Sequence, residues 1–182
     1  KIRELMMEFR TECMPILNEN NELVDIIFWE NEFSEKVNMN GSNLDVPIVI
    51  MAGGLGTRLK PLTNVIPKPL IPIGDKTMLE EIFERFARHG CNDFYISVNY
   101  KSDLIEFYLK NQNLKYNILL FKEEKPMGTA GSLSLLKDKL KQTFFVNNCD
   151  ILINEDYSQI LEYHRENRNE ITLVAALKTF DI

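Results

Sequence analysis

The sequence has few of the side chains that hold a metal ion through sulfur or nitrogen. It contains three cysteines and two histidines in 182 residues, and the cysteines stand far apart, with no CxxC pair. A zinc site of the usual kind is therefore not expected. Three widely spaced cysteines are typical of reduced thiols, which predicts a cytoplasmic protein.

Long apolar runs and an excess of positive charge are also missing. No segment resembles a signal peptide, and no apolar run approaches the roughly 20 residues of a membrane-spanning helix, so no membrane partner is expected. The net charge of -6 gives no overall positive field that would attract nucleic acid. A bound phosphate group would therefore need a local cluster of basic residues. Apolar residues make up 45% of the chain, which is enough for a folded core.

The first part of the chain, residues 1–37, differs in pattern from the rest. Apolar residues recur at helical spacing in residues 2–9. The MPIL segment, a turn-prone Asn/Glu stretch and the apolar residues 23–28 predict a β-hairpin, and residues 30–36 predict the start of a polar helix. Residues 38–45 are rich in Asn, Gly and Ser, which predicts a linker.

Strand and helix patterns alternate after the linker. Strands are predicted at residues 46–51, 94–98, 116–121, 144–146 and 171–177, and helices at residues 79–89, 102–110, 131–140 and 157–168, the second of them capped by Ser102. Alternating strands and helices predict an α/β fold in which right-handed crossovers build a mostly parallel sheet. We therefore expect a Rossmann-like fold of three layers, with helices on both faces of the sheet.

A glycine-rich loop, Gly53-Gly54-Leu55-Gly56, follows the first of these strands. Open parallel sheets bind ligands beyond the carboxyl ends of their strands, and glycines let several backbone N–H groups approach a phosphate. The P-loop pattern GxxxxGK[ST] is absent, and the dinucleotide pattern GxGxxG would need a glycine where Leu59 stands. The loop therefore predicts a phosphate site of another kind.

Two basic residues follow the loop. The guanidinium of Arg58 is a planar, permanently charged group that suits phosphate oxygens. Lys68 lies between Pro67 and Pro69, which should hold Lys68 in an extended conformation at a fixed place. The alternative is a surface turn with an incidental arginine and lysine.

The complete string AGGLGTRLKPLTNVIPKPL, residues 52–70, is harder to explain as a surface turn. It resembles the signature of the sugar-1-phosphate nucleotidyltransferases, the superfamily that makes nucleotide sugars. The resemblance covers residues 46–182, which would be the N-terminal part of such a domain.

Two later segments extend this resemblance. EKPMGTAGS resembles the second nucleotide-binding segment of the family, and its motif begins at either Glu123 or Glu124. FFVNNCDIL, residues 144–152, resembles the strand that ends in a metal-binding aspartate. Cys149 stands where the family usually has glycine, and the aspartate, Asp150, is kept.

The resemblance implies that a nucleoside triphosphate reacts with a sugar-1-phosphate to give a nucleotide sugar and pyrophosphate. Arg58 and Lys68 would grip the triphosphate and neutralise the leaving group, and Asp150 would hold Mg²⁺. The nucleotide-binding residues implied are Ala52, Gly53, Gly54, Gly56, Thr57, Arg58, Lys68, Gly128 and Thr129. The family takes a second metal-binding aspartate and a lysine for the sugar phosphate from later in its chain. We therefore expect residues 1–182 to hold a nucleotide without catalysing turnover.

Residues 1–37 resemble the C-terminal half of a cystathionine-β-synthase-type (CBS) module, which runs helix, strand, turn, strand. Such modules usually bind adenine nucleotides in pairs, through a Ser/Thr-x-x-Asp motif after the second strand. Here residues 28–32 read FWENE, which favours a structural or dimerising role and leaves a homodimer open.

A CBS-type module before a nucleotidyltransferase resembles bacterial mannose- or glucosamine-1-phosphate guanylyltransferases, so GTP is the favoured nucleotide. A UTP-, CTP- or dTTP-dependent enzyme is the nearest alternative. A non-catalytic regulatory or nucleotide-sensing subunit is another, although such a subunit need not keep Arg58, Lys68 and Asp150 together.

Overall fold

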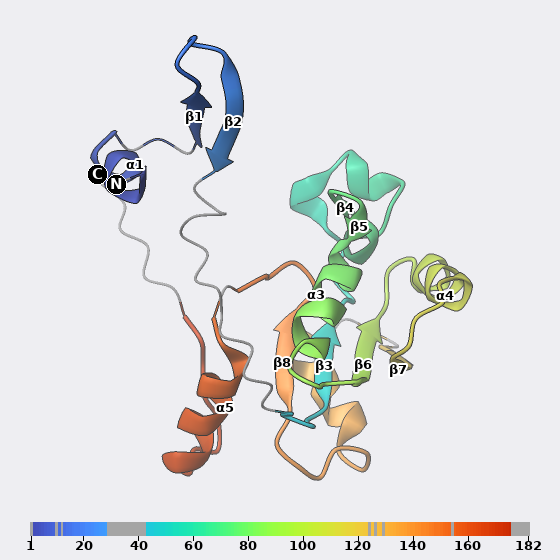
Figure 1. Ribbon diagram of the computed structural model, residues 1–182. Coiled ribbons are helices and arrows are strands. Elements are labelled where there is room, and N and C mark those ends of the chain that lie inside the picture. Colours follow the sequence, from blue (N-terminus) through green and yellow to red (C-terminus); the bar gives the residue numbers. More distant parts are fainter. Residues whose placement is uncertain are drawn as a thin grey trace, which may run out of the picture. The chain divides into compact units, whose positions relative to one another are not determined.

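The computed structural model describes residues 2–9, 11, 13–28, 43–123, 125, 127–128, 130–153 and 155–175 (Figure 1). The chain divides into two compact units, Lys1–Asn40 and Gly41–Ile182. The division falls inside the stretch for which the sequence predicts a linker. Each unit is described by itself.

The N-terminal unit contains helix α1 (Ile2–Phe9) and a hairpin of strands β1 (Cys13–Leu17) and β2 (Leu23–Phe28). The strands pair antiparallel from Cys13 opposite Phe28 to Leu17 opposite Leu23, with an irregularity near the turn. The side chain of Asn18 closes that turn, because its Oδ1 accepts hydrogen bonds from the backbone N–H groups of Asn20 and Glu22 at 2.9 and 3.0 Å.

The predicted helix and hairpin are thus confirmed. The polar helix start at 30–36 lies outside the described residues. The assignment to a CBS-type module stays a prediction.

A four-stranded parallel sheet forms the centre of the second unit. It contains β3 (Ile48–Met51), β6 (Asp93–Val98), β7 (Asn117–Lys122) and β8 (Phe145–Asn148) in the order β7-β6-β3-β8. All three strand pairs are parallel, as predicted. Strand β3, one of the two inner strands, is apolar throughout, as is typical of a strand whose two faces are both covered.

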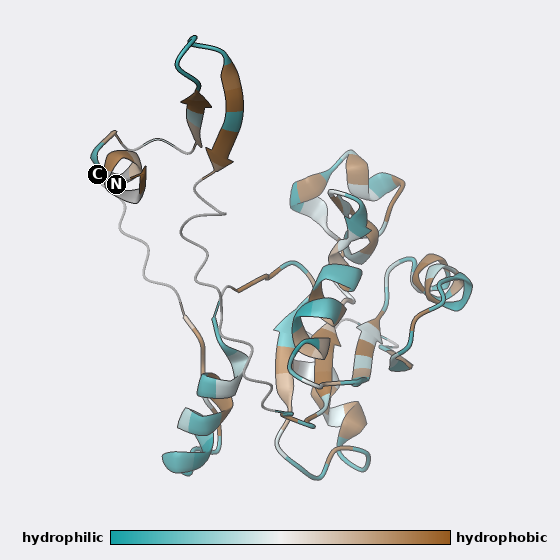
Figure 2. Ribbon diagram, in the orientation of Figure 1, coloured by the Kyte–Doolittle hydropathy of each residue, from teal (hydrophilic) through white to brown (hydrophobic). Residues whose placement is uncertain are grey.

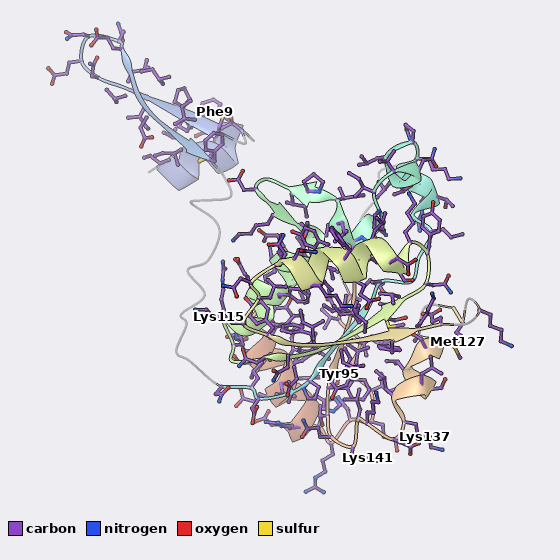
Figure 3. All side chains as sticks on the ribbon, turned by 90° about the vertical axis from the view of Figure 1, so that its right-hand side faces the viewer. Phe9, Tyr95, Lys115, Met127, Lys137 and Lys141 are labelled. Atoms are coloured by element: carbon purple, nitrogen blue, oxygen red, sulfur yellow. The ribbon has the colours of Figure 1, made fainter. Side chains whose placement is uncertain are left out.

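Alternate residues of β3 belong to opposite layers. Ile48 and Ile50 join the main core cluster with the apolar face of α3 (Met78–Ala87), while Ser132 lies against Met51, with 3.8 Å between its Oγ and the Met51 sulfur. Ser132 lies in the 3-10 helix η4 (Gly131–Leu136). Figure 2 shows apolar residues along β3 and polar residues on the outer face of α3, and Figure 3 shows side chains filling the space on both sides of the sheet.

The other helices of this unit are α4 (Ser102–Asn111) and α5 (Tyr157–Glu166). Aromatic rings connect α5 to α3 and the sheet, since Phe86 lies 4.2 Å from the Tyr157 ring and 5.5 Å from the Phe145 ring. Phe83 packs edge-on against Phe94 at 4.7 Å. No helix in the described part of the chain is long and apolar enough to cross a membrane.

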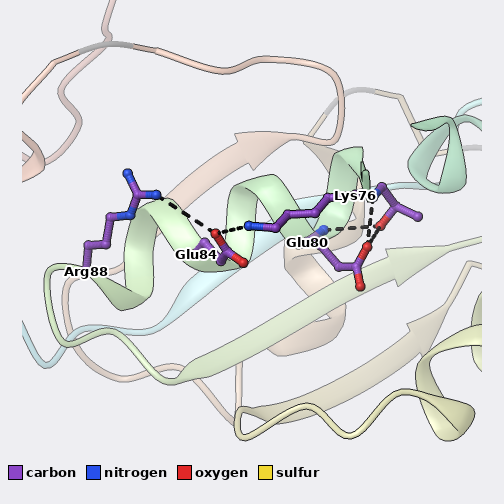
Figure 4. A network of polar contacts seen from close by, with 5 residues as sticks. Lys76, Glu80, Glu84 and Arg88 are labelled. Carbon is purple, nitrogen blue, oxygen red and sulfur yellow. Dashed lines mark hydrogen bonds and ion pairs between the residues drawn. The ribbon is translucent and has the colours of Figure 1, made fainter. Parts of the chain in front are cut away.

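A capping box fixes where α3 begins. The hydroxyl of Thr77 accepts from the Glu80 backbone N–H, and the Glu80 carboxylate accepts from the Thr77 backbone N–H at 2.8 Å. Farther along the helix, Glu84 accepts from Lys76 at 2.6 Å and lies 3.9 Å from Arg88 (Figure 4). Because α3 is anchored at its first turn, its apolar face meets the sheet in one register.

Three details of the predicted elements are wrong. Ser102 does not cap α4: Lys101 is the N-cap residue, with a φ of 53°, and Ser102 is the first helical residue. The helix predicted at 131–140 is a 3-10 helix that ends at Leu136, because Ser134 donates to the Gly131 carbonyl at 2.8 Å and competes with regular α-helical bonding. Residues 171–175 form no strand. Their apolar pattern is typical of a strand, but a strand also needs a neighbouring strand for its backbone hydrogen bonds. Residues 176–177 lie outside the described part.

Candidate nucleotide site

The cavity that contains the glycine loop lies at the carboxyl end of the sheet. Its volume is about 680 Å³, and residues that follow β3, β6, β7 and β8 all contribute to its wall. It is lined by Met51, Gly53, Gly54, Leu55, Gly56, Thr57, Arg58, Leu59, Lys68, Asn99, Glu123, Gly128, Asn148, Cys149, Asp150 and Ile151. Because parallel strands end at the same edge, residues far apart in the sequence meet there.

The glycine loop is held in one shape by Thr63. Gly56 has a φ of 63°, in the left-handed region. A Cβ at Gly56 would stand 2.7 Å from the Thr63 methyl group. Thr63 is buried, and its hydroxyl donates to the Gly56 carbonyl at 2.9 Å. The loop therefore requires glycine at this position for both conformation and space.

After the loop, the chain runs through three short 3-10 helices, η1 (Thr57–Leu59), η2 (Leu62–Asn64) and η3 (Lys68–Leu70), and a small hairpin of β4 (Pro72–Ile73) and β5 (Lys76–Thr77). Arg58 lies in η1, is exposed and lines the cavity.

The backbone of Lys68 is helical, so the extended conformation predicted for it is wrong. Lys68 begins η3, while Pro67 before it is extended with a ψ of 145°. A 3-10 turn tolerates proline at its second residue, where Pro69 is buried. Lys68 still has a fixed place, because the two buried prolines, Pro67 and Pro69, hold its backbone beside the cavity.

Lys68 and Asp150 form an ion pair across the cavity wall. The Lys68 Nζ lies 2.5 Å from Asp150 Oδ2, and the side chains are 20% and 38% exposed. Asp150 follows β8 in a turn closed by the Ile151 N–H, which donates to the Asn148 carbonyl at 3.2 Å. The sequence predicts both residues as site residues but not their contact.

Asn147 supports the turn that carries Asp150. Its side chain is buried and its amide donates to the carbonyls of Asn148 and Ile151, at 2.8 and 3.0 Å.

Cys149, directly before Asp150, is buried, and this burial raises the pKa of its thiol to about 11. Cys149 is therefore a neutral thiol at physiological pH, which suits packing and not metal binding.

Glu123 is the cavity residue whose burial the sequence does not reveal. Its carboxylate accepts a hydrogen bond from the Ser97 hydroxyl through Oε1 and one from the Met127 N–H at 3.3 Å through Oε2. It lies directly under the loop, since a Cβ at Gly53 would stand 3.0 Å from Glu123 Oε1. One signal was available: Ser97 is a polar residue between the apolar residues Ile96 and Val98 of strand β6.

The structure brings most of the predicted site residues together. Those lining the cavity are Gly53, Gly54, Gly56, Thr57, Arg58, Lys68, Gly128 and Asp150. Ala52 is buried and does not line it, and its N–H donates to the Ser97 carbonyl at 2.9 Å. Thr129 lies outside the described residues.

The residues present suit Mg²⁺ better than a metal held by protein ligands alone. Among the described residues, no group of three or more His, Cys, Asp or Glu side chains could enclose a metal ion. Mg²⁺ is usually held by one or two carboxylates together with substrate phosphates and waters. The partly exposed carboxylate of Asp150 beside the glycine loop fits that arrangement.

The sequence and the fold are similar to those of known proteins. The family model for nucleotidyl transferases matches residues 48–180. The chain is similar to mannose-1-phosphate guanyltransferase of Yarrowia lipolytica, with 39% identity over 132 residues, 70% of this chain and 36% of the relative. The enzyme of the same name from Saccharomyces cerevisiae is 36% identical over 132 residues, 70% of this chain and 37% of its own length. The chain thus spans little more than a third of these relatives.

Solved structures give the same picture. HddC from Yersinia pseudotuberculosis, in complex with GMP-PN, has a TM-score of 0.58 and 31% identity, covering 65% of this chain and 54% of HddC. A putative glucose-1-phosphate thymidylyltransferase from Bacillus anthracis has a TM-score of 0.58 and 24% identity, covering 66% of this chain and 50% of that one. The second likeness concerns the fold alone.

Proposed function

The chain belongs to the nucleotidyl transferase family, and we propose that it carries the nucleotide-binding part of an enzyme that makes a GDP-sugar from GTP and a sugar-1-phosphate. The sugar would be mannose or glucosamine, and the second product would be pyrophosphate. The observation that carries the proposal is the cavity in which the glycine loop, Arg58, Lys68 and Asp150 meet.

In this proposal, a phosphate oxygen of the sugar-1-phosphate attacks the α-phosphorus of GTP in line. A new P–O bond forms while the bond to the β-phosphate breaks, and the electron pair leaves with pyrophosphate. Arg58 and Lys68 neutralise the charge that builds on the leaving group, and the loop N–H groups orient the phosphates. The protein therefore needs no covalent nucleophile.

Enzymes of this family generally depend on a divalent metal ion. Asp150 would hold Mg²⁺ in this chain, and the ion would supply positive charge to the phosphate oxygens when bound. Asn147 keeps the Asp150 turn in place through its two amide hydrogen bonds.

The buried carboxylate of Glu123 favours guanine as the base. Guanine presents two neighbouring donors, N1–H and the 2-amino group, and a carboxylate group offers two oxygens side by side as acceptors. Uracil, thymine and cytosine do not present this pair. Glu123 lies under the loop in the cavity wall, and the relatives named above are guanyltransferases. Comparing GTP with ITP, which lacks the 2-amino group, tests this role: Glu123→Gln should reduce the preference for GTP over ITP.

The decisive experiment is a panel of nucleotides and sugar-1-phosphates with the full-length protein, with pyrophosphate release as the signal. We expect activity with GTP and either mannose- or glucosamine-1-phosphate. Activity with dTTP, UTP or CTP and none with GTP would reject the guanylyl assignment in favour of the nearest alternative. No activity with any nucleotide would favour a regulatory subunit.

Two lysine variants, one inside the cavity and one outside it, test the role of Lys68. Lys68→Ala should lower kcat/KM at least tenfold, because a contact to developing charge contributes several kcal/mol. Lys60→Ala is the matched control, since Lys60 lies in the same segment, is exposed and does not line the cavity. A loss of less than tenfold at Lys68 contradicts its proposed role.

For the N-terminal unit, we propose a structural or dimerising part related to CBS modules. The exposed face of its hairpin includes Leu17, Ile26 and Phe28, which is consistent with such a role. A homodimer and a cytoplasmic location remain part of the proposal. The mass of the full-length protein in solution, measured by light scattering, tests the dimer.

A further inference from the structure

Lys68 and Asp150 have opposite tasks in the proposed reaction, yet they bind each other. Asp150 should be available to a divalent cation, and Lys68 should be available to phosphate. In the structure, the Lys68 ammonium lies 2.5 Å from Asp150 Oδ2. One carboxylate oxygen cannot give full contact to an ammonium and to a metal ion at the same place, so the two cations compete for it.

The balance of charges in the cavity wall also supports this competition between Lys68 and a divalent cation. Among the described residues that line it, Arg58 and Lys68 are positive and Glu123 and Asp150 are negative, so the formal charges cancel. A triphosphate carries several negative charges, and it would bind in a cavity whose lining residues have no net positive charge. A divalent cation that enters with the nucleotide offsets part of this negative charge and covers Asp150.

Lys68 has the reach to change partners. A Cβ at Gly56 would stand 3.5 Å from the Lys68 Cβ, so the lysine side chain starts beside the phosphate loop. Lysine is a point charge on a flexible four-carbon stem. Its backbone is fixed in η3, with Pro67 and Pro69 buried, so rotation of the side chain is enough to move the ammonium from Asp150 toward the loop.

We propose that Lys68 works as an exchangeable counter-ion: it neutralises Asp150 and moves to a phosphate oxygen when a divalent cation replaces it at that carboxylate. This proposal rests on the proposed function and adds an order of events to it. Without a divalent cation, Lys68 stays with Asp150 and adds little to nucleotide binding. With the cation, Lys68 is released and contributes fully.

A double-mutant cycle tests the exchange. The binding of GTP to the chain is measured by calorimetry, at fixed ionic strength, in EDTA and in Mg²⁺. The proteins are the wild type, Lys68→Met, Asp150→Asn and the double variant. If Lys68→Met fails to fold, Lys68→Gln replaces it. Lys60→Met and Asp138→Asn make the same charge changes outside the cavity and serve as controls.

In EDTA, Lys68→Met should weaken GTP binding less than about threefold in the wild type and about tenfold or more in the Asp150→Asn background, the loss expected for one charge-assisted hydrogen bond. In Mg²⁺, the wild type should also lose about tenfold with Lys68→Met. Asp150→Asn alone should tighten GTP binding in EDTA, although it removes the proposed metal ligand.

Equal losses from Lys68→Met in both backgrounds in EDTA would overturn the exchange, as would effects of the same size in the two controls. The proposed function would survive either result if the wild type binds GTP in Mg²⁺. If the wild type does not bind GTP in Mg²⁺, the proposed function fails and the exchange fails with it.

Discussion

Replacing Gly56 with alanine should destabilise the second unit for two separable reasons. The backbone has a φ of 63° there, and a left-handed conformation costs a residue with a Cβ about 1–2 kcal/mol. The new Cβ would also stand 2.7 Å from the Thr63 Cγ2 and 3.2 Å from the Thr63 Cβ. Overpacking of a buried site costs a further amount of about 1–3 kcal/mol. We expect a total loss of about 2–5 kcal/mol in the free energy of unfolding.

Two further variants separate the conformational cost from the steric one. Gly74 has a φ of 60°, and a Cβ added to it would have no described neighbour within 4 Å, so Gly74→Ala should lose only the conformational part, about 1–2 kcal/mol. Adding Thr63→Ser to Gly56→Ala removes the closest methyl group and keeps the hydroxyl that donates to the Gly56 carbonyl. The pair should recover part of the loss, measured against Thr63→Ser alone.

Urea unfolding followed by circular dichroism supplies the measurement, with the midpoint compared at constant m-value. The reasoning is refuted if Gly56→Ala costs no more than Gly74→Ala. It is also refuted if Thr63→Ser gives Gly56→Ala no recovery, because the steric part is assigned to that methyl group.

Three other predictions follow from the described contacts. Thr77→Ala should cost about 1 kcal/mol and lower Tm by about 2–4 °C, because it removes the hydroxyl that caps α3. Burial raises the pKa of the Cys149 thiol from 9.0 to about 11. The neutral thiol therefore makes its full contribution to the free energy of unfolding below pH 9, and this contribution is lost as the pH rises through 11. Between pH 9 and pH 11, the wild type should lose about 2 kcal/mol more than Cys149→Ala in pH-dependent urea unfolding, and an equal loss contradicts the assignment. Asn147→Leu should cost about 1–3 kcal/mol and weaken GTP binding in Mg²⁺, because the Ile151 carbonyl loses its amide donor; unchanged calorimetric affinity would show that Asn147 does not position Asp150.

Local patterns in the sequence determined the order of strands and helices and the place of the glycine loop. Side-chain periodicity reports which face of an element is buried, and this information is local. The glycine at position 56 is also a local feature, because a left-handed backbone conformation in a loop favours glycine wherever that loop lies in the fold. The helix predicted at 131–140 shows the limit of such patterns, since a side-chain hydrogen bond from Ser134 changed its type.

Contacts between distant parts of the chain were decided only by the tertiary structure. Glu123 lies in a run of charged residues, KEEK at 122–125, and it is buried because β7 pairs beside β6 and places it against Ser97. Lys68 and Asp150 are separate motifs in the sequence, and parallel strands that end at one edge bring them within 2.5 Å. The sequence alone therefore predicted Lys68 and Asp150 as candidate site residues, and the sheet decided that they neutralise one another, because ion pairing depends on distance in space.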